Sequence, residues 1–166
     1  MSRAKTAGGK GTPATVAATQ AGIEFTLHPY EADPDADSYG EAAADALGIP
    51  HDQIFKTLIA EVDGALTVAV VPVAATLDLK SLATAAGGKR AQMADPHTAE
   101  RSTGYVLGGI SPLGQRKRLP TVIDGSVSGL VTVYVSAGRR GLQIELSPAD
   151  LILLTGGRTA EIARRH

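Results

Sequence analysis

From Ile54 to Val71 the amino-acid sequence reads IFKTLIAEVDGALTVAVV. Two apolar runs flank Asp63-Gly64, and an Asp-Gly pair in this setting is the strongest short-range signal for a β-hairpin. Helical and extended patterns alternate on both sides of the hairpin, and this interleaving together with a hairpin predicts a mixed sheet. We therefore expect one α/β domain with a mixed, barrel-like β-sheet and surrounding helices.

Capping signals predict where the other elements begin. A side chain that accepts from the first turn, often followed by proline, is typical of a helix start. Helices are expected from Thr12-Pro13, Ser38, Thr76 or Asp78, Asp95-Pro96 and Ser147-Pro148, with a closing helical turn over 159–165. Alternating or short apolar runs predict strands over 23–28, 121–123, 130–135 and 142–146, and a loop rich in glycine and basic residues spans 104–118.

Length and composition limit the class of protein. The chain has 166 residues, with 16 Lys+Arg against 17 Asp+Glu, which suits one ordinary domain. We expect residues 1–11 to form a flexible basic tail and 12–166 to form the domain. The absence of cysteine excludes disulfides, zinc–cysteine sites, iron–sulfur clusters and a cysteine nucleophile. No run reaches the roughly 18 apolar residues that span a bilayer, and no secretory signal is recognisable, so a cytoplasmic protein without a membrane partner is expected.

The charge is unevenly distributed. Residues 24–63 contain ten acids and one base, whereas residues 80–118 contain seven bases and two acids. This polarity can orient an anionic partner, although solvated faces without a partner explain it equally well. Aromatic residues make up only 4% of the chain, which argues against a platform that stacks several bases.

Lys56 is the first candidate for chemistry. Alternation places it on one strand face with Ile54 and Leu58. A lone lysine among apolar neighbours is costly to desolvate unless it lines a polar cavity. The alternative is an edge-strand lysine that deters aggregation.

The glycine-rich loop Gly108–Gly114, GGISPLG, is the second candidate. Its glycines allow the backbone to approach a ligand and to present N–H groups to developing negative charge; the alternative is a structural turn. The loop matches neither phosphate-binding glycine motif, so no nucleotide cofactor is expected. The four histidines show no metal-binding spacing, and no serine-hydrolase motif is present, so neither a metal site nor a catalytic serine is expected.

Seven ordered segments resemble the YbaK/EbsC family of freestanding aminoacyl-tRNA editing proteins. The resemblance covers 12–166 and rests on Thr12-Pro13-Ala14, Tyr30-Glu31, Phe55-Lys56-Thr57-Leu58, Met93-Ala94-Asp95-Pro96, Arg101-Ser102-Thr103-Gly104-Tyr105, the Gly108–Gly114 loop and Tyr134-Val135-Ser136. It implies a fold like the editing insertion of bacterial prolyl-tRNA synthetase. It also implies deacylation of Cys-tRNA(Pro), with Cys-tRNA(Cys) as a further substrate, in support of translation fidelity.

The same resemblance assigns roles to residues. The family's essential lysine falls on Lys56, and its substrate pocket falls on Tyr30, Tyr39, Thr57, Gly108, Gly109 and Ser136. Gln143 stands where cysteine-specific members carry aspartate, and this change removes a carboxylate partner for Lys56 or for the substrate amine. No cofactor or metal is implied.

A mechanism follows from the groups that the chain lacks. Without a thiol, metal or catalytic triad on the protein, the nucleophile is water or the substrate itself, and a cysteinyl ester carries a thiol that can attack its own carbonyl and leave as a thiolactone. Lys56 and backbone N–H groups of the glycine loop then stabilise the developing charge. The tRNA body is expected on Arg116, Lys117, Arg118, Arg139 and Arg140, with prolyl-tRNA synthetase as the partner that supplies tRNA choice.

Two alternatives remain open. One is an editing deacylase for another mischarged tRNA, such as Ala-tRNA(Pro), that uses water. The other is a non-catalytic regulatory binding module.

Overall fold

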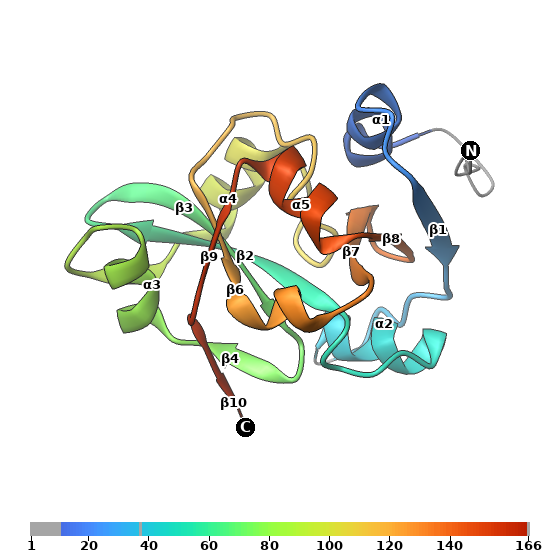
Figure 1. Cartoon of the computed structure of the whole chain (residues 1–166), viewed down its shortest axis with the longest axis horizontal. Coiled ribbons are helices and arrows are strands. Elements are labelled where there is room, and N and C mark those ends of the chain that lie inside the picture. Colours follow the sequence, from blue (N-terminus) through green and yellow to red (C-terminus); the bar gives the residue numbers. More distant parts are fainter. Residues whose placement is uncertain (1–10, 37, 166) are drawn as a thin grey trace.

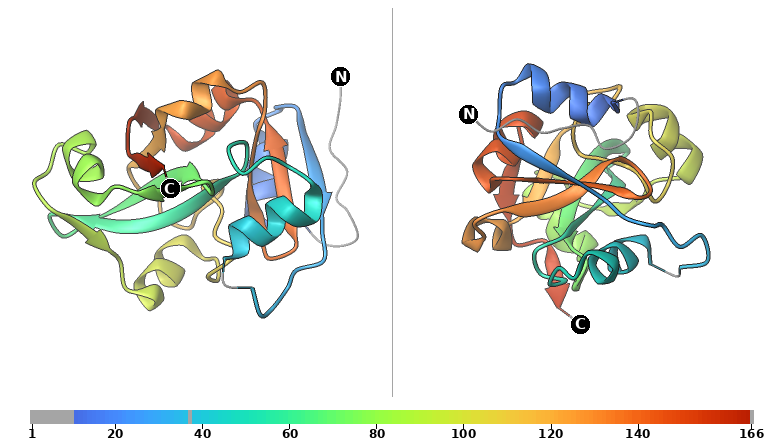
Figure 2. Two further views of the ribbon diagram at one scale, coloured as in Figure 1. Left: turned by 90° about the horizontal axis from the view of Figure 1, so that it is seen from below. Right: turned by 90° about the vertical axis from the view of Figure 1, so that its right-hand side faces the viewer.

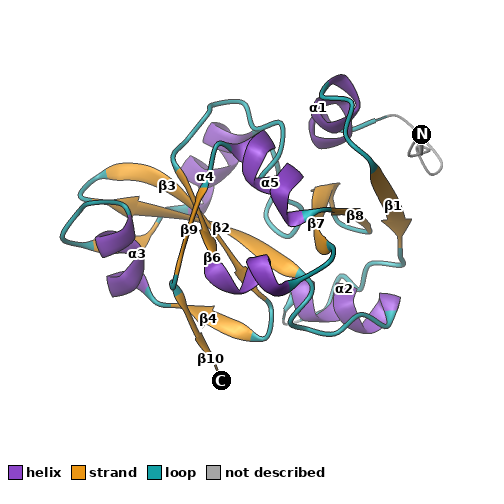
Figure 3. Ribbon diagram, in the orientation of Figure 1, coloured by secondary structure: helices purple, strands orange, loops and turns teal. Residues whose placement is uncertain are grey.

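The computed structural model describes residues 11–36 and 38–165, so the predicted tail lies outside the described residues except for Gly11. Helices surround the sheets, as Figures 1 and 3 show. The helices are α1 (Pro13–Gln20), α2 (Tyr39–Leu47), α3 (Leu79–Ala85), α4 (Pro96–Thr103) and α5 (Pro148–Thr155), with one 3₁₀ turn, η1 (Gly125–Gly129). None of the helices in the described part of the chain is long and apolar enough to cross a membrane.

The predicted helix starts are confirmed by side-chain caps. The cap side chains of α1 to α5 each accept a hydrogen bond from a first-turn backbone N–H, which satisfies a donor that the helix itself cannot pair. These caps are Thr12, Ser38, Asp78, Asp95 and Ser147. Of the two alternatives for α3, Asp78 is the cap and Thr76 lies in a strand.

The strands of the described residues form three sheets. A five-stranded sheet has the order β5-β2-β3-β6-β9, a three-stranded sheet has the order β1-β8-β7, and β10 pairs with β4. The bounds are β1 (Phe25–Pro29), β2 (Phe55–Val62), β3 (Ala65–Pro72), β4 (Ala75–Leu77), β5 (Ala91–Met93), β6 (Thr121–Asp124), β7 (Val133–Arg139), β8 (Leu142–Leu146), β9 (Arg158–Ala160) and β10 (Ala163–Arg165). The large sheet is mixed as predicted, because β5-β2-β3 pair antiparallel and β3-β6-β9 pair parallel.

Two expectations about the strands are wrong. The sheets do not close into a barrel in the described part of the chain: the strands form three separate sheets, and the segment before β2 joins β7 only at the isolated bridge between Ile54 and Tyr134 and the hydrogen bond from the Tyr134 N–H to the Gln53 carbonyl. The closing segment 159–165 is not helical. Its residues belong to β9 and β10. One carboxylate oxygen of Asp124 accepts from the backbone N–H groups of Ile162 and Ala163, where β10 begins. Tertiary pairing therefore overrides the local helical pattern.

Apolar side chains on both faces of the β2–β3 hairpin are buried in different clusters. Phe55 and Ile59 pack toward the three-stranded sheet and α5, whereas Ala60 and Val62 pack toward α3. The hairpin tip and α3 lie at one end of the long axis, and α2 and the three-stranded sheet lie at the other (Figures 1 and 2). Strand β2 thus runs from the second group of elements to the first.

Candidate active site

A cavity of about 290 Å³ lies at the start of β2. It brings together seven of the eight residues predicted for catalysis and the substrate pocket: Tyr30, Tyr39, Lys56, Thr57, Gly108, Ser136 and Gln143. Residues of α2, β2, β7, β8 and the loop after α4 all contribute to the lining. Gly109 is the predicted pocket residue that does not line it.

Both Lys56 and Thr57 border the cavity, although their side chains belong to opposite strand faces. Strand β3 pairs with β2 from Phe55 to Val62, but β5 pairs with β2 only from Ala60 to Val62. The edge of β2 that faces away from β3 therefore has no β5 partner over the first part of the strand, before Ala60. A cavity at such an edge is accessible to side chains from both faces of the strand.

Lys56 is a half-buried cation without a close counterion. Burial lowers the pKa of its ammonium, and the charge of Glu41 partly offsets this by raising it. No carboxylate lies within ion-pair distance of Lys56 among the residues that the structure describes. A partly desolvated ammonium without an ion-pair partner is available to an anionic group or to a developing negative charge.

Two polar atoms of the cavity lining are buried without a hydrogen-bond partner in the described structure: Thr57 Oγ1 and Gln143 Oε1. The Gln143 side chain belongs to a residue that is only 6% exposed. A buried polar group left unpaired costs about 1–3 kcal/mol. Unpaired groups that line a cavity mark positions where a ligand can supply the missing partners.

The start of the glycine-rich loop offers few free backbone donors to the cavity. The N–H of Gly109 donates to the Val106 carbonyl at 2.9 Å, and the N–H of Leu107 donates to Glu100 Oε2 at 2.9 Å. These two groups are occupied, which leaves the Gly108 N–H as the candidate donor of the three. A Cβ on Gly109 would lie 2.8 Å from the Arg139 Cα, so this glycine permits close packing against the backbone of the β7–β8 turn.

The five basic residues predicted to bind tRNA lie on two separate exposed segments. Arg116, Lys117 and Arg118 follow α4, and the N–H groups of Arg116 and Lys117 donate to the last-turn carbonyls of Thr103 and Ser102. Arg139 and Arg140 lie at the β7–β8 turn. None of the five lines the cavity, but Arg140 contacts two residues that do, Tyr39 and Leu107.

Sequence reasoning missed a polar cluster on the same face of the three-stranded sheet as Gln143. Glu145 Oε1 lies 2.9 Å from His28 Nε2, and Thr132 donates to Glu145 Oε2 at 2.6 Å. Burial raises the pKa of Glu145, but hydrogen bonds from Thr132, His28 and Tyr134 outweigh it, and the net shift is downward. The alternation of Gln143 and Glu145 along β8 was the available signal, since residues two apart share a face.

Comparison with known proteins identifies the family of the chain. The family model of the aminoacyl-tRNA editing domain matches residues 33–154. The chain is 43% identical over 129 residues, 76% of its length, to an Enterococcus faecalis protein provisionally named Cys-tRNA(Pro)/Cys-tRNA(Cys) deacylase EbsC, of which 77% is covered. It is 31% identical over 110 residues to the multifunctional Ser/Thr-tRNA deacylase ProXp-y of Escherichia coli, with 64% of each chain covered.

A solved structure shows the same fold. The crystal structure of a candidate trans-editing enzyme for prolyl tRNA synthetase superposes with a TM-score of 0.80 at 24% identity, and the match covers 92% of this chain and 95% of that one. Taken with the family model and the relative from E. faecalis, these findings show that the chain belongs to the YbaK family of aminoacyl-tRNA editing domains.

Proposed function

We propose that this aminoacyl-tRNA editing protein removes cysteine in trans from Cys-tRNA(Pro), and also from Cys-tRNA(Cys). The observation that carries the proposal is the cavity at the start of β2, whose lining includes a half-buried Lys56 without an ion-pair partner and two unpaired polar atoms. The name of the relative from E. faecalis supports cysteine as the amino acid.

The bond to be broken is the ester between the cysteine carbonyl and a ribose oxygen of the terminal adenosine. In the proposed step the cysteine sulfur attacks the carbonyl carbon, a C–S bond forms, and the C–O ester bond breaks. The thiol proton ends on the departing ribose oxygen, and the products are a thiolactone and deacylated tRNA. Holding the thiol in a near-attack position can lower the activation barrier by up to about 7–11 kcal/mol.

The residues of the cavity support this step without acting as nucleophiles. The Lys56 ammonium stabilises negative charge on the carbonyl oxygen and then on the leaving oxygen, with the Gly108 N–H as a second donor. Gln143 Oε1 accepts from the substrate ammonium, and Thr57 Oγ1 pairs with a second polar group of the aminoacyl-adenosine. Because Gln143 is neutral, its bond to the ammonium is weaker than that of a carboxylate.

The tRNA body binds through phosphate contacts to Arg116, Lys117, Arg118 and Arg139 in this proposal. Such contacts are salt-sensitive and carry little sequence information. Prolyl-tRNA synthetase is therefore proposed to supply the choice of tRNA, and the fold shared with the candidate trans-editing enzyme is consistent with that partner.

A second candidate function is deacylation of Ala- or Ser-charged tRNA by water. Two observations favour it: Gln143 in the lining, and the similarity to a relative named as a Ser/Thr-tRNA deacylase. Water attack needs no thiol on the substrate, so the two functions differ in the substrates that they cleave.

One experiment separates the two functions. Purified protein is mixed in excess with labelled Cys-, Ala- and Ser-tRNA(Pro), and the released product is identified as free amino acid or thiolactone. We expect Cys-tRNA(Pro) to be cleaved fastest, with thiolactone release. Equal rates for all three substrates with free amino acids as products would establish water attack, and no cleavage of any of them would contradict both candidates.

A further inference from the structure

Arg140, at the turn between β7 and β8, is in contact with two separate parts of the cavity wall. Its Nε–H donates to the Leu107 carbonyl at 3.0 Å. Its guanidinium lies over the ring of Tyr39, 4.3 Å from the centroid, which is within the range of a cation–π interaction. One side chain thus joins the β7–β8 turn, the loop after α4 and the first turn of α2.

Gly108 shows how closely these three segments pack. It has a φ of +85°, and a Cβ at this position would lie 2.5 Å from Arg140 Nε and 2.9 Å from Tyr39 Cδ2. The positive φ and the absence of a side chain therefore both serve the contact between Arg140 and Tyr39. A residue with a side chain at position 108 would collide with both Arg140 and Tyr39.

Burial contributes little to holding Val106 and Leu107, the part of the loop after α4 that Arg140 contacts. Val106 is 58% exposed and Leu107 is 39% exposed, so neither residue is anchored by a surrounding core. Core residues anchor the loop on both sides of this pair, at Tyr105 and Ile110. Leu107 itself is held by polar contacts: Glu100 accepts from its N–H on one side, and Arg140 donates to its carbonyl on the other. Without the Arg140 side chain, the hydrogen bond from the β7–β8 turn to Leu107 is lost, while the bond of Leu107 to Glu100 and the packing of Gly109 against the Arg139 backbone remain.

We infer that Arg140 is a positioning residue, which holds Tyr39 and Leu107 together as one wall of the cavity, and is not a phosphate contact. The inference rests on the proposed deacylase function for its kinetic consequences. Arginine suits this role because its planar group can donate at the edge and stack with its face at the same time. A lysine can make one of these interactions but not both.

The test compares Arg140→Ala, Arg140→Lys and Arg139→Ala by deacylation kinetics on Cys-tRNA(Pro) at several salt concentrations. Arg140→Ala is expected to lower kcat about tenfold, from the loss of one hydrogen bond and one cation–π contact, with an unchanged salt dependence. Arg140→Lys should recover part of kcat. Arg139→Ala, the neighbouring proposed phosphate contact, should instead reduce the slope of log affinity against log salt by about one.

Two further measurements make the test specific. In a double-mutant cycle measured by the free energy of unfolding without substrate, Tyr39→Leu and Arg140→Ala should be coupled, because both variants disrupt the same contact. Amide hydrogen exchange over residues 105–110 should accelerate in Arg140→Ala and less so in Arg140→Lys, whether or not any substrate is cleaved. Arg90→Ala removes an exposed cation at the far end of β2 and serves as the control, with kcat and exchange over 105–110 unchanged.

The outcomes separate the inference from the proposed function. Unchanged kcat and unchanged exchange in Arg140→Ala would overturn the inference while deacylation by the wild type stands. A reduced salt slope with unchanged kcat would overturn it in favour of a phosphate contact. If the wild-type protein cleaves no mischarged tRNA, the proposed function fails. Accelerated exchange in Arg140→Ala would still show that Arg140 holds the Leu107 segment of the cavity wall in place.

Discussion

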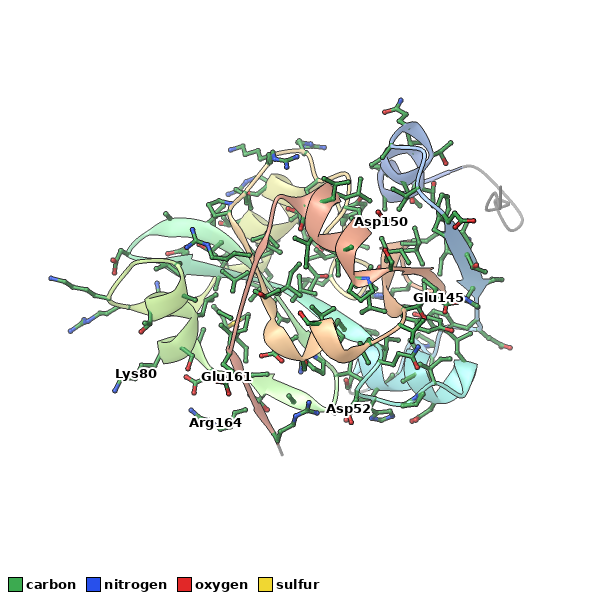
Figure 4. The ribbon with its side chains drawn as sticks, in the orientation of Figure 1. Asp52, Lys80, Glu145, Asp150, Glu161 and Arg164 are labelled. Atoms are coloured by element: carbon green, nitrogen blue, oxygen red, sulfur yellow. The ribbon has the colours of Figure 1, made fainter. Side chains whose placement is uncertain are left out.

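Strand β2 borders two cavities, one at each end, and they differ in a way that identifies the site. The cavity at its beginning measures about 290 Å³ and contains Lys56. The cavity at the hairpin tip measures about 580 Å³ and is lined by charged residues that include Asp63, Lys80 and Arg90. Figure 4 labels Lys80 at this second end and Glu145 at the opposite end of the molecule.

Polar side chains that line the larger cavity already have hydrogen-bond partners within the protein. The Asp63 carboxylate accepts from the backbone N–H groups of Lys89 and Arg90, at 3.0 Å each, and Gln92 donates to Glu61 at 3.4 Å. The smaller cavity holds the unpaired oxygens of Thr57 and Gln143, and Lys56, whose ammonium forms no ion pair with a described residue. Unsatisfied polar groups, and not volume, therefore distinguish the candidate active site.

The largest expected effect comes from removing the cation of the smaller cavity. Lys56→Ala should lower kcat for Cys-tRNA(Pro) by about 10²–10³-fold, the usual loss when one stabilising donor is removed from a developing oxyanion. Single-turnover deacylation measures it. Lys80→Ala, which removes a lysine from the larger cavity, is the matched control and should retain full activity; equal losses in the two variants would erase the distinction.

The opposite cavity should respond in stability. Asp63→Ala removes the acceptor of two backbone N–H groups and puts alanine at a φ of +50°. We expect the free energy of unfolding to fall by about 1–2 kcal/mol, with kcat unchanged. Urea denaturation measures the free energy of unfolding. Asp63→Asn, which keeps one acceptor oxygen and tolerates the positive φ, should lose less; a larger loss in the asparagine variant would contradict this account.

Thr57→Val should change stability in the other direction. The Thr57 hydroxyl is buried without a partner, so an isosteric methyl should raise the free energy of unfolding by up to about 1 kcal/mol while activity falls about fivefold. Thr67, on the neighbouring strand, is the matched control because its buried hydroxyl donates to the Ala65 carbonyl at 3.3 Å. Thr67→Val should be destabilising, and the same sign for both substitutions would show that the Thr57 hydroxyl has no special status.

The smallest effect concerns the pH dependence of stability. Because burial lowers the pKa of Lys56, the folded state releases this proton at a lower pH than the unfolded state does. Between the lowered pKa and the ordinary value near 10.5, the unfolded state binds more protons, so the contribution of Lys56 to stability rises with pH.

Lys56→Met isolates this contribution. The variant should be more stable than the wild type at pH 7, and the advantage should shrink as the pH approaches 10. Denaturation of both proteins across this range measures the difference, in which the contributions of tyrosines and other lysines cancel. An advantage that stays constant with pH would show that the Lys56 pKa is unchanged by folding.

Local signals predicted the elements well where a short segment contains its own partner. The Asp63-Gly64 hairpin and the caps at Thr12, Ser38 and Ser147 involve residues close in the chain, and each was predicted correctly. The strands Ala75–Leu77 and Ala91–Met93 were missed, because three residues carry little periodic signal and gain their hydrogen bonds only from distant strands.

The candidate site shows the same division. Lys56 was conspicuous as a lone cation in an apolar strand, and the other pocket residues came from the resemblance to a family. The contacts that Arg140 and Gly109 make were not foreseen, because the hydrogen bond to Leu107 and the packing against Arg139 join segments about 30 residues apart. No local pattern contains such a contact.

The sequence by itself determined the class of fold, the hairpin that carries Lys56 and the family of the protein, since these depend on periodicity, turn chemistry and ordered motifs. Only the tertiary structure decided that the sheets stay separate, that the last segment is extended, which backbone N–H groups remain free and which polar atoms are left without partners. The physical reason is that a hydrogen bond can be satisfied by any part of the chain that reaches it, so its outcome is known only when all segments are in place.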